Sequence, residues 1–241
     1  MDLTRLARTG GPVLFWRGPN FDTLDLTGPV IANWVNKGVG LFGDYDLGPD
    51  FTLFVPLPGG LHWRELVAIL SVLLAGGRVV LGAQGGAGGE QSAVPDGDFH
   101  ALVPLGFESD PAIASAEEIF VFNPPALALS TPVDADFIDV NSAIRAYPDV
   151  TPRRLDGSGT LAVLGPAGTT EIPWTAEMPA GRPAGILVSH STPHEDQWPD
   201  LLGHLLGGGE TVLGTGVDEA RIADLARELG EVRGRLGTWT K

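Results

Sequence analysis

The segment TLFVPLPGGLHWRELVAILSVLLAGGRVVLG, residues 52–82, decides the fold. The apolar run at 51–55 is typical of a buried strand, and the longer apolar stretch after it predicts a buried helix. Gly76 and Gly77 end this helix, and RVVLG predicts the next strand. A strand, a helix and a second strand in this order predict a parallel βαβ unit.

A similar order recurs in GILVSHSTPHEDQWPDLLGHLLGGGETVLG at residues 185–214. The glycine stops and the VLG endings align with an offset of about 132 residues, whereas the tryptophans need a small gap. Two such units predict one domain with two similar α/β halves, at 1–90 and 156–241, joined by a proline-rich segment at 91–155. Any two βαβ units share this order, so coincidental similarity is the alternative.

The segments around these units predict further short elements. Thr27 caps an early helix, and Asp218 caps a late amphipathic helix that Gly230 ends. Strands are predicted at 14–17, 21–26, 51–55, 78–82, 118–122 and 138–140. The predicted fold class is α/β, with mostly parallel sheets flanked by helices.

The charge and the lack of cysteine exclude several classes of function. The formal net charge is -15, so nucleic acid is not expected as a partner. No cysteine is present, which excludes disulfides, thiol catalysis and cysteine-ligated zinc. The apolar run at 66–74 is about half of the roughly 20 residues that a membrane span needs. The N-terminus lacks the apolar core of a signal peptide, so we expect a cytoplasmic protein without a membrane span.

The motif PAGTTEIPW, residues 166–174, has the small residues and hydroxyls of a loop that wraps a phosphate. It follows LAVLG, an apolar segment that predicts a strand. The carboxylate of Glu171, however, would repel a phosphate. Glycine-rich motifs are weak signals on their own, so an ordinary turn is the alternative.

The order of these motifs resembles the acyl-adenylate-forming enzymes. That superfamily includes acyl- and aryl-CoA synthetases, peptide-synthetase adenylation domains and firefly luciferase. Its opening runs helix, G-x-G-x-x-D-x-V turn, strand, buried helix and G-A-x-x-x-P, and residues 32–82 follow that order. Its phosphate loop, [ST]-S-G-[ST]-T-G-x-P-K, comes later in the chain. The resemblance is strong at 24–82 and 160–214, and it implies an AMP-binding N-terminal region.

Aligned with that loop, PAGTTEIPW keeps some of the residues that would bind phosphate and loses others. Gly168, Thr169 and Thr170 match, whereas Glu171 replaces the second glycine and Trp174 replaces the lysine. Two like charges about 4 Å apart repel by roughly 4 kcal/mol at an effective dielectric near 20. The lost lysine contact would contribute about 1.5–3 kcal/mol. We therefore predict a vestigial phosphate loop that binds ATP poorly.

The resemblance implies two further features of this degenerate site. Trp174 is expected to project toward the former phosphate site, where it would plug the cleft or stack on a planar ligand. The family's later elements, including a threonine–glutamate segment for AMP and Mg²⁺ and a C-terminal domain with a catalytic lysine, would follow Lys241. The expectation is thus a truncated relative.

Histidines and acidic residues gather in SHSTPHEDQW, residues 189–198. The candidate metal ligands are His190, His194, Glu195, Asp196 and His204. Their H-x-x-x-H spacing lies in a proline-containing loop, and the acidic pair also suits a helix N-terminus. Ser189 and His190 would point to opposite faces of a strand, which disfavours a nucleophile–base pair. We predict no metal ligand and no catalytic residue.

Three hypotheses of function follow from these observations. The first, which we favour, is a degenerate domain without ligase activity or cofactor that binds a partner protein or forms a homodimer. The second is an ATP- and Mg²⁺-dependent acyl-activating ligase, or another enzyme in the same cleft, with cations from Arg153, Arg154 or Arg182. The third is a binding protein for a small acyl or aromatic ligand. Whether the chain is an enzyme is thus left open.

Overall fold

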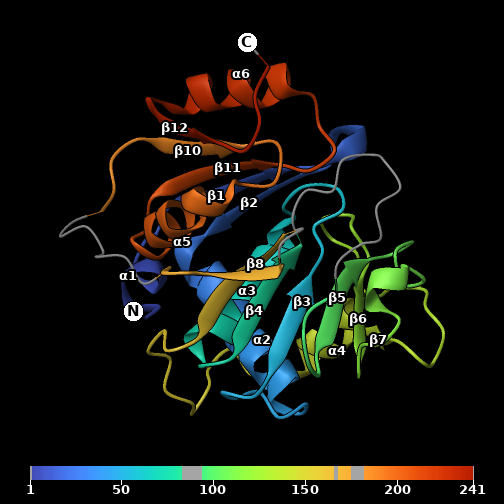
Figure 1. Cartoon of the computed structure of the whole chain (residues 1–241). Helices are drawn as coiled ribbons and strands as arrows, with labels where there is room; N and C mark the ends of the chain where they lie inside the picture. Colours follow the sequence, from blue (N-terminus) through green and yellow to red (C-terminus); the bar gives the residue numbers. More distant parts are fainter. Residues whose placement is uncertain (1, 83–93, 166–167, 175–181, 241) are drawn as a thin grey trace.

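The computed structural model describes residues 2–82, 94–165, 168–174 and 182–240, and its strands form two sheets (Figure 1). The five-stranded sheet has the order β12-β10-β11-β1-β2, and the seven-stranded sheet has the order β7-β6-β5-β3-β4-β8-β9. Neighbouring strands are parallel except for the pairs β1–β2 and β8–β9. The predicted α/β class with mostly parallel sheets is confirmed.

The five-stranded sheet combines the start of the chain with its last third. Its strands are β1 (Pro12–Arg17), β2 (Thr23–Thr27), β10 (Ile186–Ser189), β11 (Glu210–Gly214) and β12 (Val232–Leu236). The helices beside it are α1 (Thr4–Ala7), α5 (Trp198–Leu206) and α6 (Glu219–Leu229). Helix α6 covers the outer face of this sheet through Ile222 and Ala226, which pack against strand residues in a separate apolar cluster (Figure 1).

The seven-stranded sheet takes its strands from the middle of the chain. They are β3 (Thr52–Val55), β4 (Arg78–Gly82), β5 (His100–Pro104), β6 (Ile119–Phe122), β7 (Ile138–Asp139), β8 (Thr160–Gly165) and β9 (Gly168–Ile172). Its helices are α2 (Gly28–Gly43), α3 (Trp63–Leu74) and the short α4 (Val140–Ala143). All of α3 is buried, as its largely apolar sequence predicts, and Arg64, Glu65 and Ser71 are buried with it. No helix in the described residues is long and apolar enough to cross a membrane.

The two predicted βαβ units are present as β3-α3-β4 and β10-α5-β11. Each unit lies in a different sheet, and the five-stranded sheet also takes β1 and β2 from the start of the chain, whereas the seven-stranded sheet also takes β8 and β9 from beyond residue 155. The proline-rich segment at 91–155 supplies β5, β6 and β7, so it builds three of the seven strands of the larger sheet as well as connecting the two units.

Two local predictions differ from the structure around the first hairpin and the middle segment. The strand predicted at 21–26 begins at Thr23, because Asn20 and Phe21 turn the chain with positive φ angles of 55° and 62°. Strand β5, whose sequence HALVP is short and ends in proline, was not among the predicted strands. Asp218 caps α6 as predicted, accepting from the amides of Ala220 and Arg221, whereas Thr27 occupies the N-cap position of α2 without a side-chain bond to the helix.

The two βαβ units also share a capping motif before their helices, which an alignment of their tryptophans does not show. HWRE begins α3 and HEDQ leads into α5, and both form a capping box in which the histidine is the cap. The amide of His62 donates to Glu65 Oε2 at 2.7 Å, and that of His194 donates to Gln197 Oε1 at 3.0 Å. His62 and His194 are separated by the same offset of 132 residues as the VLG endings, which favours duplication over coincidence.

Helices α2 and α3 pack closely where Gly38 faces Ser71. A Cβ at Gly38 would lie 2.3 Å from Ser71 Oγ, whose hydroxyl is bonded to Val35 O and Val67 O. We expect Gly38→Ala to lower the free energy of unfolding by about 1–3 kcal/mol, because the packed hydroxyl has no room to move. Urea unfolding followed by circular dichroism measures the change.

Gly203 in α5 is the matched control, because nothing lies within 4 Å of a Cβ at that position. There, alanine is expected to stabilise the protein by up to about 1 kcal/mol through helix propensity alone. Equal effects of the two substitutions would contradict close packing at Gly38.

Candidate functional site

The predicted phosphate loop folds as a β-hairpin. Strands β8 and β9 are antiparallel, and Gly165 pairs with Gly168 around Pro166 and Ala167, which lie outside the described residues. Thr169 then pairs with Leu164 in the same ladder. Gly168 has a positive φ of 109°, as in a turn, but the backbone that would have to curl around a phosphate is extended from Thr169 onward.

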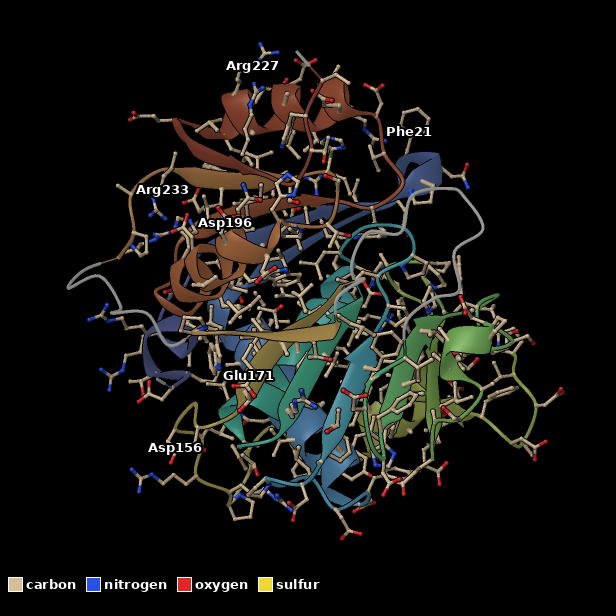
Figure 2. All side chains as sticks on the ribbon, in the orientation of Figure 1. Phe21, Asp156, Glu171, Asp196, Arg227 and Arg233 are labelled. Atoms are coloured by element: carbon tan, nitrogen blue, oxygen red, sulfur yellow. The ribbon has the colours of Figure 1, made fainter. Side chains whose placement is uncertain are left out.

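A phosphate loop would turn its side chains toward the ligand, but in β9 most of the corresponding side chains face solvent at the edge of the sheet. Strand β9 is the edge of its sheet, Gly168 and Thr170 are exposed, and Thr169 is half-buried. Glu171 is exposed opposite Ala162 and is labelled in Figure 2. Its carboxylate thus lies within the very segment that resembles a phosphate loop.

Trp174 does not project toward the phosphate site, and this expectation is wrong. Strand β9 runs back along β8, so Trp174 lies beside Gly159, at the opposite end of the hairpin from the turn. At about 3.3 Å per residue, some 20 Å separate Trp174 from Gly168. The indole is 2% exposed within the main core, and its Nε1 donates to Gly159 O at 2.9 Å. It neither plugs the cleft nor remains free to stack on a ligand.

The arginines considered as replacements for the missing lysine have partners elsewhere. Arg153 donates to Leu47 O, and Arg154 forms an exposed ion pair with Asp156 at 3.3 Å. Arg182 binds Gly208 O and Glu210, which brings it to the five-stranded sheet. These arginines flank the loop motif in sequence, but none of the three is bonded to residues 168–174, the part of the motif that the structure describes.

The histidines and acidic residues near 190–204 are dispersed among separate contacts. His194 caps the turn before α5, and His190 faces Glu219 at 3.6 Å. His204 is buried, its Nε2 lies 2.9 Å from Glu210 O, and burial lowers its pKa. Within residues 2–82, 94–165, 168–174 and 182–240, no group of three or more such side chains could hold a metal ion.

The start of α3 holds a buried polar cluster that the sequence analysis did not single out. His62 Nδ1 accepts from the amide of Arg64, so its Nε2 carries the proton and donates to Pro124 O at 2.9 Å. Burial lowers the pKa of His62 to about 3 and raises that of Glu65 to about 8. Both side chains are therefore neutral at pH 7, and their role is to fix the helix start. The H-x-x-[EQ] spacing at residues 62–65, repeated at 194–197, is the feature of the sequence that could have predicted this cluster.

Loops at the carboxyl ends of the strands connect the two sheets. Thr215, after β11, accepts from Trp16 Nε1 and donates to Leu61 O, both at 2.9 Å. A Cβ at Gly60 would lie 3.6 Å from Ser191 Cα, so the loops after β3 and β10 also touch. Carboxyl ends of parallel strands are where α/β folds bind ligands. At this junction the described loops bind one another.

The structure is similar to those of several large ligases and synthetases. An acyl-CoA synthetase from Brucella canis matches with a TM-score of 0.67 at 15% identity, over 97% of this chain and 47% of that protein. The anthranilate CoA ligase AuaEII in complex with anthranoyl-AMP matches with a TM-score of 0.58 at 14% identity, over 93% and 46%. The amide bond synthetase McbA from Marinactinospora thermotolerans gives 0.53 at 15% identity, over 95% and 47%.

These comparisons show the fold that the sequence resemblance implied. At this level of identity they show the fold alone, and the chain spans about half the length of the enzymes it matches. No protein-family model matches the sequence, and no curated protein matches it.

Proposed function

We propose that this protein is a degenerate form of the adenylate-forming fold, without ligase activity, that acts by binding a partner protein or a second copy of itself. The observation that carries the proposal is the β8–β9 hairpin. Its Gly168, Thr169 and Thr170 are, in this proposal, vestiges of a phosphate loop: Gly168 has a turn-like φ of 109°, but Thr169 and Thr170 belong to an extended edge strand that also presents Glu171.

Electrostatics supports the loss of nucleotide binding. A triphosphate needs donors and cations arranged around it, because its charges must be offset when water is removed. The hairpin brings a carboxylate instead, and the nearest arginines in sequence are bonded elsewhere. The acidic chain as a whole adds a repulsive field.

Exposed apolar side chains support a role in association. Phe21, Leu127 and Leu129 are 81%, 78% and 64% exposed, and they lie on two loops joined by a bond from the Ala126 amide to Asp22 Oδ2 at 2.7 Å. Large exposed apolar side chains that gather in one place are typical of protein-binding surfaces. This surface is the proposed place for a partner.

The similar structures favour a second candidate function, the binding of a small acyl or aromatic acid. One of them is an anthranilate CoA ligase with anthranoyl-AMP bound, and another is an acyl-CoA synthetase. A chain with their fold could retain the acid-binding half of that chemistry without ATP. A functional ligase with Mg·ATP remains the third candidate.

Calorimetric titration with Mg·ATP separates these candidates. We expect no binding by the wild-type protein below about 1 mM, because the repulsion by Glu171 consumes most of the roughly 4 kcal/mol that a 1 mM site represents. Glu171→Gly should gain at most weak binding, since the strand geometry remains. Wild-type binding in the micromolar range would contradict the proposal and favour the ligase. Saturable binding of anthranilate without turnover would favour the acid-binding protein.

A further inference from the structure

Two neighbouring loops present three large apolar side chains to solvent, and we call these three the apolar patch. Phe21 lies in the turn between β1 and β2, at the edge of the molecule in Figure 2. Leu127 and Leu129 lie in the loop after β6. The bond from the Ala126 amide to Asp22 Oδ2, at 2.7 Å, holds the two loops together.

The loop after β6 is held from inside, so its two leucines are fixed in their outward positions. The buried Arg64 donates through Nη2 to the carbonyls of Ala126 and Ala128, both at 3.2 Å. Asn141 Nδ2 also donates to Ala128 O, at 2.9 Å. The alanines are buried or half-buried, whereas the leucines that follow each of them are exposed. A surface that is ordered before association loses little conformational entropy when a partner covers it.

The turn that carries the aromatic ring of the patch has a strained backbone. Asn20 and Phe21 have positive φ angles of 55° and 62°, a conformation that bulky residues rarely adopt. The guanidinium of Arg221 lies 4.8 Å from the centre of the Phe21 ring, but the ring stays largely open to solvent. Strained residues gather at functional positions, so an exposed ring held in this way indicates a binding contact.

The charges around the patch favour a second copy of this chain over a strongly charged partner. Residues 119–133 contain no charged side chain, although the chain has 30 acidic and 15 basic residues. On the other loop, Arg221 opposes the charge of Asp22, and Asp25 is paired with Arg17 at 2.6 Å. The net charge of -15 makes two copies repel each other over most of their surface. The patch is where two such chains approach with little repulsion.

The arrangement of the patch suits a two-fold axis. In a two-fold interface the same surface faces itself in reverse, so each side chain meets a different one across the axis. The patch has an aromatic ring on one loop and two aliphatic side chains on the other, on either side of the bond between Asp22 and Ala126. With the axis near this bond, the ring of each copy covers the leucines of the other.

We propose that the apolar patch is a two-fold interface between copies of this chain, in which Phe21 of each copy packs against the partner's Leu127 and Leu129. It rests on the proposed function, in which the chain acts by association, and it assigns a second copy as the partner. The titration with Mg·ATP tests the loss of nucleotide binding separately, so either result can fail without the other.

Sedimentation velocity of the wild-type protein over a range of concentrations is the first test. We expect an equilibrium between monomer and dimer. Added salt should strengthen the dimer, because it screens the repulsion between two acidic chains and leaves the apolar contact intact. A protein that stays monomeric up to about 1 mM, or a dimer that salt weakens, would overturn the proposal.

Leu127→Ser tests whether the patch forms the interface. Leu127 is exposed, so the substitution should leave the fold intact, which circular dichroism checks. Because two-fold symmetry makes the substitution act twice, we expect the dissociation constant of the dimer to rise about a hundredfold. Val150→Ser is the matched control, because Val150 is 72% exposed on the loop before β8, outside the patch, and should leave the constant unchanged. A dimer that tolerates Leu127→Ser would reject this interface.

Discussion

Replacing Trp174 by lysine, the residue that a working phosphate loop would carry, is expected to destabilise the fold without restoring ATP binding. Trp174 is buried in the main core, so its loss leaves a large cavity that an ammonium group cannot fill. Removing a large buried aromatic side chain lowers the free energy of unfolding by about 3–5 kcal/mol, which is a large part of the stability of a typical domain. Urea unfolding measures the loss, and calorimetry with Mg·ATP tests binding.

Trp174→Phe is the control for this substitution. It keeps an aromatic ring in the core but removes the bond to Gly159 O, so a loss of about 1–2 kcal/mol is expected. If Trp174→Lys were as stable as the wild type and bound ATP, the indole would instead face the nucleotide site. The hairpin geometry, with Trp174 at the far end from the turn, makes the opposite prediction.

Glu65→Gln is expected to make the protein more stable than the wild type at pH 8 and above. Glu65 is 1% exposed, and burial raises its pKa from 4.5 to about 8. Above pH 8 the folded wild type must therefore hold a buried negative charge, at a cost of up to about 5 kcal/mol. Glutamine can accept the same bond from the His62 amide without a charge, as Gln197 does in the equivalent capping box.

The pH dependence has a definite sign. Between pH 4.5 and about 8 the folded state holds a proton on Glu65 that the unfolded chain has lost, so the free energy of unfolding falls as pH rises. His62 acts oppositely, because burial lowers its pKa from 6.5 to about 3. Below pH 6.5 the unfolded chain binds a proton on this residue that the folded state does not, so the free energy of unfolding falls as the pH falls. From pH 4.5 to 6.5 the two slopes cancel, and above 6.5 only the loss from Glu65 remains.

Urea unfolding of the wild type and Glu65→Gln from pH 5 to 9 measures this difference. The two curves should agree near pH 5 within about 1 kcal/mol and then separate progressively up to about pH 8, because His62 titrates in both proteins and only Glu65 differs between them. Gln197→Glu is the matched control, because Gln197 is only half-buried and a carboxylate there stays hydrated. Parallel curves for wild type and Glu65→Gln would show that Glu65 is not buried as the structure describes.

The sequence predicted most of the secondary structure because that information is local. The apolar run of α3, the glycines after it and the cap at Asp218 each lie within one element, and all are confirmed. Strand β5 was missed because HALVP has only a short apolar core beside a proline. Phe21 was assigned to a strand because its apolar side chain fits one, but the preceding Asn20 turns the chain.

The candidate site was predicted less well, because its chemistry depends on where side chains point. The motif at 166–174 gave the positions of Gly168, Thr169 and Thr170, and their proposed role as a vestigial loop stays a prediction. Alignment placed Trp174 beside a phosphate, whereas strand pairing places it in the core. A match in sequence fixes the order of residues but not the path of the chain between them.

The sequence by itself determined the α/β class, the two βαβ units and the lack of cysteine chemistry, because these follow from local periodicity and composition. Only the tertiary structure decided how the five-stranded sheet combines strands from both ends of the chain, and how Trp16, Thr215 and Leu61 connect the two sheets across 199 and 154 residues. It also decided that Glu65 is neutral and that Arg64 Nε and Trp63 Nε1 have no acceptor among the described residues. The burial of a side chain and its hydrogen-bond partners depend on groups that are distant in sequence. Burial and partners in turn decide its pKa and whether its hydrogen bonds are satisfied.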